Sequence, residues 1–167
     1  MARRMGNRMS KAWAGIVAVA EDLTADGTTL HGALNFESPS TILRCMGEYV
    51  IQPTSSVTAG DEVIIAVGLA VVSTDAVAAG AGSLPDPSAE PEYPWLYWAS
   101  HPFIFNAAGV DRLTDPSAGR FSFDVRSRRR VKPRESLALI VEYGNVGTGG
   151  SPPITIASGN TRVLYAF

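Results

Sequence analysis

The sequence predicts an all-β fold, and three observations lead to this prediction. The chain has 167 residues, of which 46% are hydrophobic, so a single domain with a substantial core is expected. Gly (16) and Pro (11) are frequent and separate apolar runs rich in Val, Ile and Thr, as in strands joined by turns. No strand–helix alternation and no internal repeat is visible. We therefore expect an antiparallel β-sandwich with Greek-key connections, of jelly-roll type, over residues 12–167.

The first half of this domain contains four strand candidates. The segment WAGIVAVA at 13–20 is rich in β-branched residues, which favours a strand over a helix, and a short strand follows at 30–36. TILRCMGEYVIQ at 41–52 predicts a long strand with a glycine irregularity at Gly47. DEVIIAVGLAVVST at 61–74 is apolar on both faces, so we place it at the centre of a sheet that is covered on both sides.

The second half begins with a long acidic loop, AVAAGAGSLPDPSAEPEYP, at 76–94. Further on, Phe121, Phe123 and Val125 alternate with polar residues, which is typical of a half-buried strand. A turn at Ser158-Gly-Asn160 is expected to separate the last two strands. The strands of this half are expected at 95–105, 120–126, 136–143, 154–156 and 161–167.

The basic residues are concentrated in two zones, although the net charge is only −2. From residue 12 to 111 there is one basic residue, Arg44, against twelve acids. Residues 1–11 contain no acid and are expected to form a flexible arm. Such separation of charge matters for association more than for folding. The arm carries Arg3, Arg4, Arg8 and Lys11, and the second zone carries Arg126, Arg128, Arg129, Arg130, Lys132 and Arg134.

Three interpretations of the second basic zone stay open. It contacts carboxylates of a neighbouring subunit, or it is a solvated hairpin end that protects an edge strand from aggregation. Alternatively, its guanidiniums bind nucleic acid through bidentate hydrogen bonds and counterion release. The arm is a candidate for the same kinds of contact, with a neighbour or with packaged nucleic acid, and many copies would add their effects.

An aromatic segment is the second candidate site, because Tyr93, Trp95, Tyr97 and Trp98 lie within six residues of each other. In an extended chain Trp95 and Tyr97 would share one face and Trp98 would lie on the other. One face is expected to join the core. An exposed second face would provide a platform for a sugar or a protein partner.

Catalytic and metal-binding motifs are absent from the sequence, so we expect a protein that is not an enzyme and holds no cofactor or metal. It has no GxSxG, HExxH or GxxxxGK[ST] pattern. Cys45 is the only cysteine, and His31 and His101 are the only histidines. The acidic segment 75–92 lacks the spacing of a calcium loop.

Two further classes receive little support. An enzyme of unfamiliar type would need converging polar groups, for which Arg44, Glu48 and His101 are the nearest candidates, but no nucleophile–base pair is visible. A membrane protein with spanning helices is not expected, because the longest apolar run, VIIAVGLAVV at 63–72, falls short of the roughly 20 residues that a helix needs.

Several segments together suggest a family resemblance. ILRCMGEY, the Ala/Gly/Pro-rich loop before WLYW, and VRSRRRVKPRESLALIVEY resemble small β-rich virion proteins encoded in bacteriophage genomes. The resemblance implies a capsid or capsid-decorating subunit of jelly-roll type. Its partners would be copies of itself and other virion proteins, and it would be made in the host cytoplasm and reside in the virion. The alternative is a carbohydrate- or receptor-binding β-sandwich module that uses the segment from Trp95 to Trp98.

Overall fold

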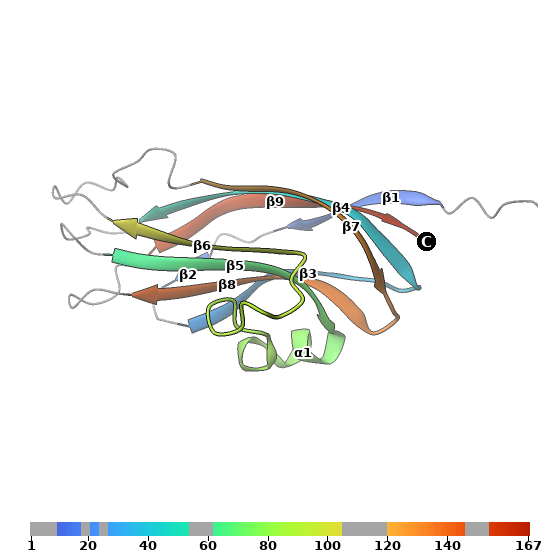
Figure 1. The fold of residues 1–167 in the computed structure, drawn as a ribbon, viewed down its shortest axis with the longest axis horizontal. Coiled ribbons are helices and arrows are strands. Elements are labelled where there is room, and N and C mark those ends of the chain that lie inside the picture. Colours follow the sequence, from blue (N-terminus) through green and yellow to red (C-terminus); the bar gives the residue numbers. More distant parts are fainter. Residues whose placement is uncertain (1–9, 18–20, 24–26, 54–61, 105–119, 146–153) are drawn as a thin grey trace, which may run out of the picture.

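The protein is a sandwich of two antiparallel sheets (Figure 1). The computed structural model describes residues 10–17, 21–23, 27–53, 62–104, 120–145 and 154–167. Sheet A has the strand order β1-β9-β4-β7, with β2 also paired to β9, and sheet B has the order β3-β8-β5-β6. The strands are β1 (Lys11–Val17), β2 (Glu21–Leu23), β3 (Gly27–Asn35), β4 (Ser40–Pro53), β5 (Glu62–Ser73), β6 (Tyr97–Ile104), β7 (Arg120–Val131), β8 (Glu135–Asn145) and β9 (Ile154–Ala166).

The strand pairing is nested, which is the pattern of a jelly roll. The pair β5–β6 lies innermost in the sequence, β4–β7 and β3–β8 enclose it, and β1–β9 is outermost. All these pairs are antiparallel, and β4–β9 and β5–β8 join them into the two sheets. A long hairpin rolled upon itself in this way gives two four-stranded Greek-key sheets. The predicted sandwich of jelly-roll type is confirmed.

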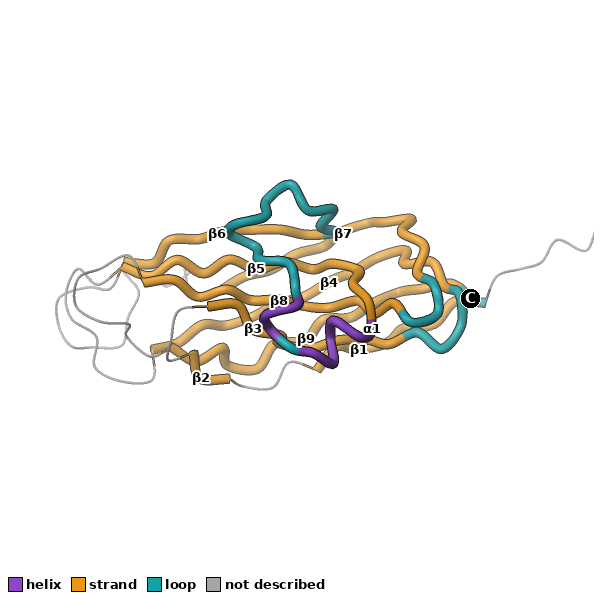
Figure 2. The backbone as a smooth tube through the Cα atoms, turned by 90° about the horizontal axis from the view of Figure 1, so that it is seen from below, coloured by secondary structure: helices purple, strands orange, loops and turns teal. Residues whose placement is uncertain are grey.

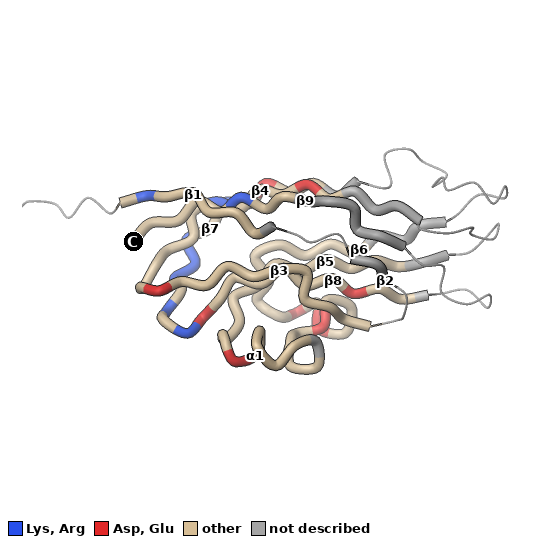
Figure 3. The backbone as a smooth tube through the Cα atoms, turned by 180° about the vertical axis from the view of Figure 1, so that it is seen from behind, with Lys and Arg blue, Asp and Glu red and all other residues tan. Residues whose placement is uncertain are grey.

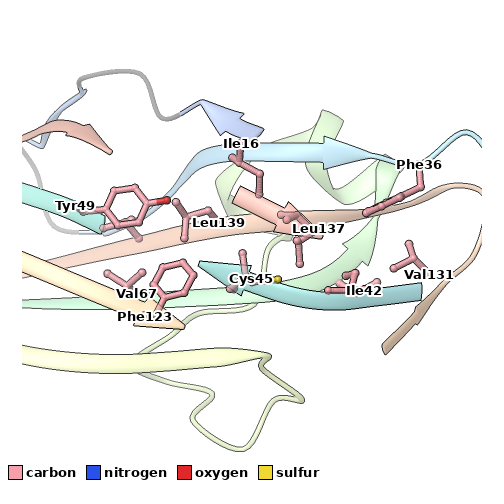
Figure 4. Packing of buried hydrophobic residues seen from close by; sticks show 14 of the residues in the cluster. Ile16, Phe36, Ile42, Cys45, Tyr49, Val67, Phe123, Val131, Leu137 and Leu139 are labelled. Atoms are coloured by element: carbon pink, nitrogen blue, oxygen red, sulfur yellow. The ribbon is translucent and has the colours of Figure 1, made fainter. Parts of the chain in front are cut away.

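The main core fills the space between the two sheets (Figure 4). On β5 and β8 the odd-numbered residues face this space, and Ile65, Leu69, Leu137 and Leu139 are fully buried there. They meet side chains of sheet A such as Ile42, which is also fully buried. Burying an aliphatic side chain of this size contributes about 1.5–3 kcal/mol. The alternation explains why one face of each strand is committed to the core.

The outer side of sheet B is covered as well. A short helix, α1 (Thr74–Ala79), a 3₁₀ turn, η1 (Ala81–Ser83), and the loop that follows lie over it (Figure 2). The even-numbered residues Ala70, Val72 and Ile140 are therefore buried from the outside. The prediction that 61–74 lies at the centre of a sheet covered on both sides is confirmed, since β5 lies between β8 and β6.

Helix α1 was not predicted, because residues 76–94 were expected to form a loop, although the sequence contains signals for a helix. Ser73 is its N-cap and accepts a hydrogen bond from the backbone N–H of Ala76 at 3.1 Å. Gly80 ends it with a φ of 85°, a left-handed conformation that favours glycine. The helix has only six residues and no buried apolar side chain. It is therefore too short to produce a helical periodicity of apolar residues in the sequence.

The last strand also differs from the expectation. The predicted turn at 158–160 is wrong, because β9 runs without a break from Ile154 to Ala166. Hydrogen bonding to β4 along its length outweighs the local turn preference. Glu48 of β4 pairs with Asn160 of β9, and Val50 pairs with Ala157. One residue of β4 therefore lies opposite two residues of the Ser-Gly-Asn segment, which forms a bulge within β9 in place of a turn.

Candidate functional site

The outward side chains of sheet A form a basic surface, here termed the basic face. Cross-strand register places Arg126 of β7 beside Arg44 of β4, and Arg44 beside Leu164 of β9. In the same way Arg130 lies in register with Thr41. Adjacent strands are about 4.8 Å apart, so the face measures about 14 Å across its four strands. Among the residues whose side chains are described, its basic residues are Lys11, Arg44, Arg126, Arg128, Arg130 and Arg162. Figure 3 shows where Lys and Arg lie along the backbone of this sheet.

A β-bulge in β4 decides that Arg44 belongs to this face. The register shifts between Ile42 and Arg44 against both neighbouring strands. Ile42 and Cys45 are fully buried, whereas the Arg44 side chain is 36% exposed. With regular alternation Arg44 would point inward with Ile42, so the bulge turns it to the outside.

An ion pair lies in the middle of the basic face. The Arg44 guanidinium donates from Nε and Nη2 to the two carboxylate oxygens of Asp124, at 2.7 and 2.5 Å. These hydrogen bonds lower the pKa of Asp124, and the positive charge of Arg126 adds to the effect. Asp124 therefore stays ionised and offsets one of the cations around it.

An exposed tryptophan borders the same cations. The Arg162 guanidinium lies 5.1 Å from the ring centroid of Trp13, and 45% of Trp13 is exposed. This cation–π contact holds the ring against β9 and leaves much of it open to solvent. The basic face therefore combines guanidiniums with a large aromatic surface.

Charge is divided between the two sides of the sandwich. Among the residues whose side chains are described, Asp124 and Glu48 are the acids of the basic face. Two guanidiniums about 5 Å apart in water repel each other by roughly 1 kcal/mol, so a cluster of this kind favours an anionic partner. Acidic residues gather on the opposite side, over sheet B: Asp75, Asp86, Glu90, Glu92 and Glu142.

The other residues of the predicted basic zone, Arg129, Lys132 and Arg134, lie near the turn between β7 and β8. Pro133 and Arg134 are the central residues of this turn, which is closed by the Glu135 N–H donating to the Lys132 carbonyl at 3.1 Å. Arg134 has a φ of 69°, and it is the only residue other than glycine with a positive φ in the described part of the chain. That position of the turn favours glycine. Lys132 and Arg134 are exposed, as is Arg129 at the end of β7.

The aromatic segment does not form one surface. Trp95 precedes β6 and packs on the outside of sheet B, with its ring filling the space above Gly68. Tyr93 lies beside it, with the ring centroids 5.1 Å apart. Tyr97 instead stacks on Phe123 at 4.5 Å and contacts the main core. The expectation that Trp95 and Tyr97 share a face is wrong, because strand geometry starts only at Tyr97.

Trp98 is the most exposed ring of this segment. It is 41% exposed, and its indole Nε1 donates to the Pro87 carbonyl at 2.5 Å. The edge of the ring is thus held by the loop over sheet B. Binding of a sugar or protein partner by Tyr93, Trp95, Tyr97 and Trp98 stays a prediction.

The acidic loop is attached to β8 by a network around Ser88. The Ser88 N–H and hydroxyl donate to Glu142 at 2.8 and 2.6 Å, and the N–H also donates to Asp86 at 2.9 Å. Burial and a hydrogen bond to the Asp86 carboxyl raise the pKa of Glu142. Burial acts against ionisation of Asp86 as well, but hydrogen bonds from Glu142, Ala89 and Ser88 lower its pKa. As the pH falls, Glu142 therefore takes up a proton before Asp86 does.

The structure brings together some of the predicted site residues and adds others. Arg126, Arg128 and Arg130 alternate onto the basic face, and Lys11 begins β1 at its edge. Sequence reasoning missed Arg162 and Trp13, which lie in the last and first strands and meet only because β1 pairs with β9. The predicted arm residues Arg3, Arg4 and Arg8 lie outside the described residues, so the arm and its contacts stay predictions.

The residues considered for an unfamiliar enzyme do not converge in the described structure. Arg44 and Glu48 lie on the outer side of β4, and His101 lies on β6 of the other sheet, with its side chain outside the description. Among the described residues, no three His, Cys, Asp or Glu side chains gather as a metal site would require. The same part of the chain contains no helix with the length and apolar character needed to cross a bilayer.

Comparisons with known proteins give matches only among solved structures. No protein-family model matches the sequence, and no curated protein matches it either. A structure of infectious bursal disease virus, Gx strain, is 17% identical with a TM-score of 0.45, and the match covers 98% of this chain and 36% of that chain. The capsid structure of Helicobacter pylori bacteriophage KHP30 is 16% identical with a TM-score of 0.36, covering 95% of this chain and 94% of that one.

A third match is of another kind. A CocE/NonD family hydrolase from Staphylococcus aureus is 10% identical with a TM-score of 0.36, over 99% of this chain and 36% of that chain. The solved structures similar to this chain thus include a virus structure, a bacteriophage capsid structure and a hydrolase. Since these TM-scores lie below 0.5, the function proposed below rests on the residues of the chain itself.

Proposed function

We propose that this protein is a non-enzymatic structural subunit of a bacteriophage virion, as a capsid or capsid-decorating protein that assembles with copies of itself. Its jelly-roll fold supports a structural role, because this double-sheet architecture is common in viral capsid domains. The fold also occurs in lectins, so the specific support must come from the surface.

The conformation of Arg134 is the observation that carries the proposal. Its φ of 69° is one that glycine adopts without cost and that an L-residue adopts at a cost of about 1 kcal/mol. Local strain of this kind is often found where a side chain has a function. Lys132 and Arg134 are both exposed in this turn, and the Glu135 carboxylate accepts from the backbone N–H of Lys132 at 2.8 Å.

The carboxylates of a neighbouring copy would complement this turn. Glu90 and Glu92 are exposed on the loop over sheet B, on a part of the molecule that the turn of the same copy does not cover. A contact between two different surfaces is heterologous, and repetition of it extends to further copies or closes into a ring. Exposed ion pairs are individually weak, so assembly would depend on many contacts together.

Charge-reversal substitutions on the turn and on the loop over sheet B test the proposal. We expect the purified chain to form large assemblies in light scattering and negative-stain microscopy, and these should weaken as salt rises. The variants K132E/R134E and E90K/E92K should each remain unassembled. When they are mixed, the acidic turn of one variant can meet the basic loop of the other, and assembly should return.

A matched control separates this contact from a general effect of charge. The variant R126E/R128E changes the net charge by the same amount as K132E/R134E but alters the basic face, and it should assemble normally. A chain that stays monomeric at high concentration and low salt would rule out self-assembly. If assembly persists in K132E/R134E, the turn is not the contact.

A further inference from the structure

We infer that the basic face binds single-stranded nucleic acid, through phosphate contacts to its arginines and stacking of a base on Trp13. This inference goes beyond the proposed assembly role and does not depend on it. The residues concerned come from β1, β4, β7 and β9, and only the fold brings them together. They are Lys11, Trp13, Arg44, Arg126, Arg128, Arg130 and Arg162.

The type of cation favours phosphate as the partner. Five of the six basic residues of the face are arginines, and the planar guanidinium can donate two parallel hydrogen bonds to one phosphate. Arg126, Arg128 and Arg130 alternate along β7 at a spacing of about 6.6 Å, so they form a row along which a phosphate backbone can run. The adjacent Asp124 is already paired to Arg44 and repels the backbone less than a free carboxylate would.

The exposed aromatic ring favours a single strand over a duplex. Bases of a single strand are free to stack on aromatic side chains, whereas those of a duplex are stacked on one another. Trp13 is 45% exposed and its position is held by Arg162 at 5.1 Å, so it is ready to receive a base without reordering. A sheet face about 14 Å wide accommodates a strand that crosses it from β7 to β1.

A second copy of the chain is a weaker candidate for this surface. In the proposed assembly Glu90 and Glu92 of that copy meet the turn between β7 and β8, and Asp86 and Glu142 are occupied with Ser88 and with each other. Nucleic acid supplies a phosphate at every residue and, by releasing counterions, binds with an affinity that depends on salt in a predictable way.

The inference can be tested by measuring how a fluorescent oligothymidylate binds to the full chain. Fluorescence anisotropy gives the affinity at each of several salt concentrations. The variant R126Q/R128Q/R130Q removes three charges from the face, and R129Q/K132Q/R134Q removes three from the region of the turn. Each phosphate contact on a single strand contributes about 0.7 to the slope of log affinity against log salt. We expect the face variant to lower the magnitude of the slope by about 2, and the turn variant to leave it near that of the wild type.

Substitution of Trp13 provides an independent readout. Trp13→Ala should weaken binding about fivefold or more with the salt slope unchanged, and Trp13→Phe should retain most of the affinity. Circular dichroism confirms that each variant is folded. Equal affinities and slopes for the wild type and the face variant would overturn the inference. It would also be overturned if the face variant loses assembly while its nucleic-acid affinity is unchanged, since the face would then be a contact between copies.

Discussion

Arg44 on β4 and Asp124 on β7 form a two-point ion pair across neighbouring strands, although they are 80 residues apart in the sequence. The pair is exposed, so its effect on folding is small compared with its effect on the surface charge. Asp124 is the carboxylate that restrains the positive potential at the centre of the basic face.

Removal of that carboxylate should therefore strengthen binding of nucleic acid. In Asp124→Asn the face gains one net positive charge and the Arg44 guanidinium becomes available to a phosphate. Anisotropy titration with oligothymidylate should show tighter binding, with little change in the melting temperature. Glu90→Gln makes the same change in net charge on the other side of the molecule and should have a smaller effect. Weaker binding by Asp124→Asn would mean that the ion pair is needed to orient Arg44.

Arg134→Gly should stabilise the fold and weaken assembly at the same time. Glycine relieves the cost of a φ of 69°, which we expect to raise the free energy of unfolding by about 1 kcal/mol in urea denaturation. The same change removes a charge from the proposed contact, so light scattering should show smaller assemblies. Arg134→Asn, which tolerates this conformation better than arginine and also lacks the charge, should behave similarly. If both variants assemble normally, neither the strained conformation nor the charge of Arg134 is needed for assembly, and the proposed contact is wrong.

Gly68 should not accept a side chain. A Cβ at this position would lie 2.2 Å from the ring of Trp95, so Gly68→Ala must displace the ring or the strand. We expect a loss of about 1–3 kcal/mol in the free energy of unfolding, as for other overpacked sites.

A double-mutant cycle with Trp95→Ala checks the cause, because the alanine at 68 should cost little once the ring is absent. Gly82→Ala serves as a control, since a Cβ there meets nothing within 4 Å. An equal penalty at Gly68 with and without the Trp95 ring would contradict the proposed clash.

The attachment of the acidic loop should depend on pH through Glu142. Its pKa is raised in the folded chain, by burial first and then by Asp86, so its stabilising effect is complete below its ordinary value of 4.5. The effect is lost as pH rises through the folded-state pKa. The pKa of Asp86 is lowered, so its contribution is present above its ordinary value of 3.8 and is lost in more acidic solution.

Glu142→Gln should remove the part of the pH dependence that lies above about pH 4.5, because the amide oxygen still accepts from Ser88 but cannot ionise. Melting temperatures measured from about pH 4.5 to pH 7 should fall more for the wild type than for the variant. Glu90→Gln, on the exposed part of the same loop, should follow the wild-type profile. Parallel profiles for Glu142→Gln and the wild type would show that the carboxyl pair does not control the loop.

Cys45 should be inert to thiol reagents in the folded protein. Its side chain is fully buried between the sheets, and burial raises the pKa of its thiol to about 12. Labelling with a chromogenic disulfide near pH 8 should therefore be slow and should follow the opening of the sandwich. The chain unfolded in guanidinium chloride should react at once. Rapid, complete labelling under native conditions would contradict the position of β4 in the core.

Much of the fold follows from local patterns in the sequence. Phe121, Phe123 and Val125 predicted a half-buried strand, and β7 is one. The two-sided apolar run at 61–74 predicted a covered central strand, which β5 is. These predictions succeed because the periodicity of a strand and the exclusion of apolar groups from water act within a few residues. The basic zone at 126–134 was visible for the same reason, since charge density is a local property of the sequence.

The tertiary structure decided which further residues join the basic face. Arg44 faces outward because a bulge shifts the register between it and Ile42, and such a shift depends on the packing of both neighbouring strands. Arg162 meets Trp13 because the last strand pairs with the first, a contact that no local pattern encodes. Within a strand, successive side chains alternate between the two sides of the sheet. A shift of one residue in register moves each side chain to the opposite side, and the register is determined only when the sheets assemble.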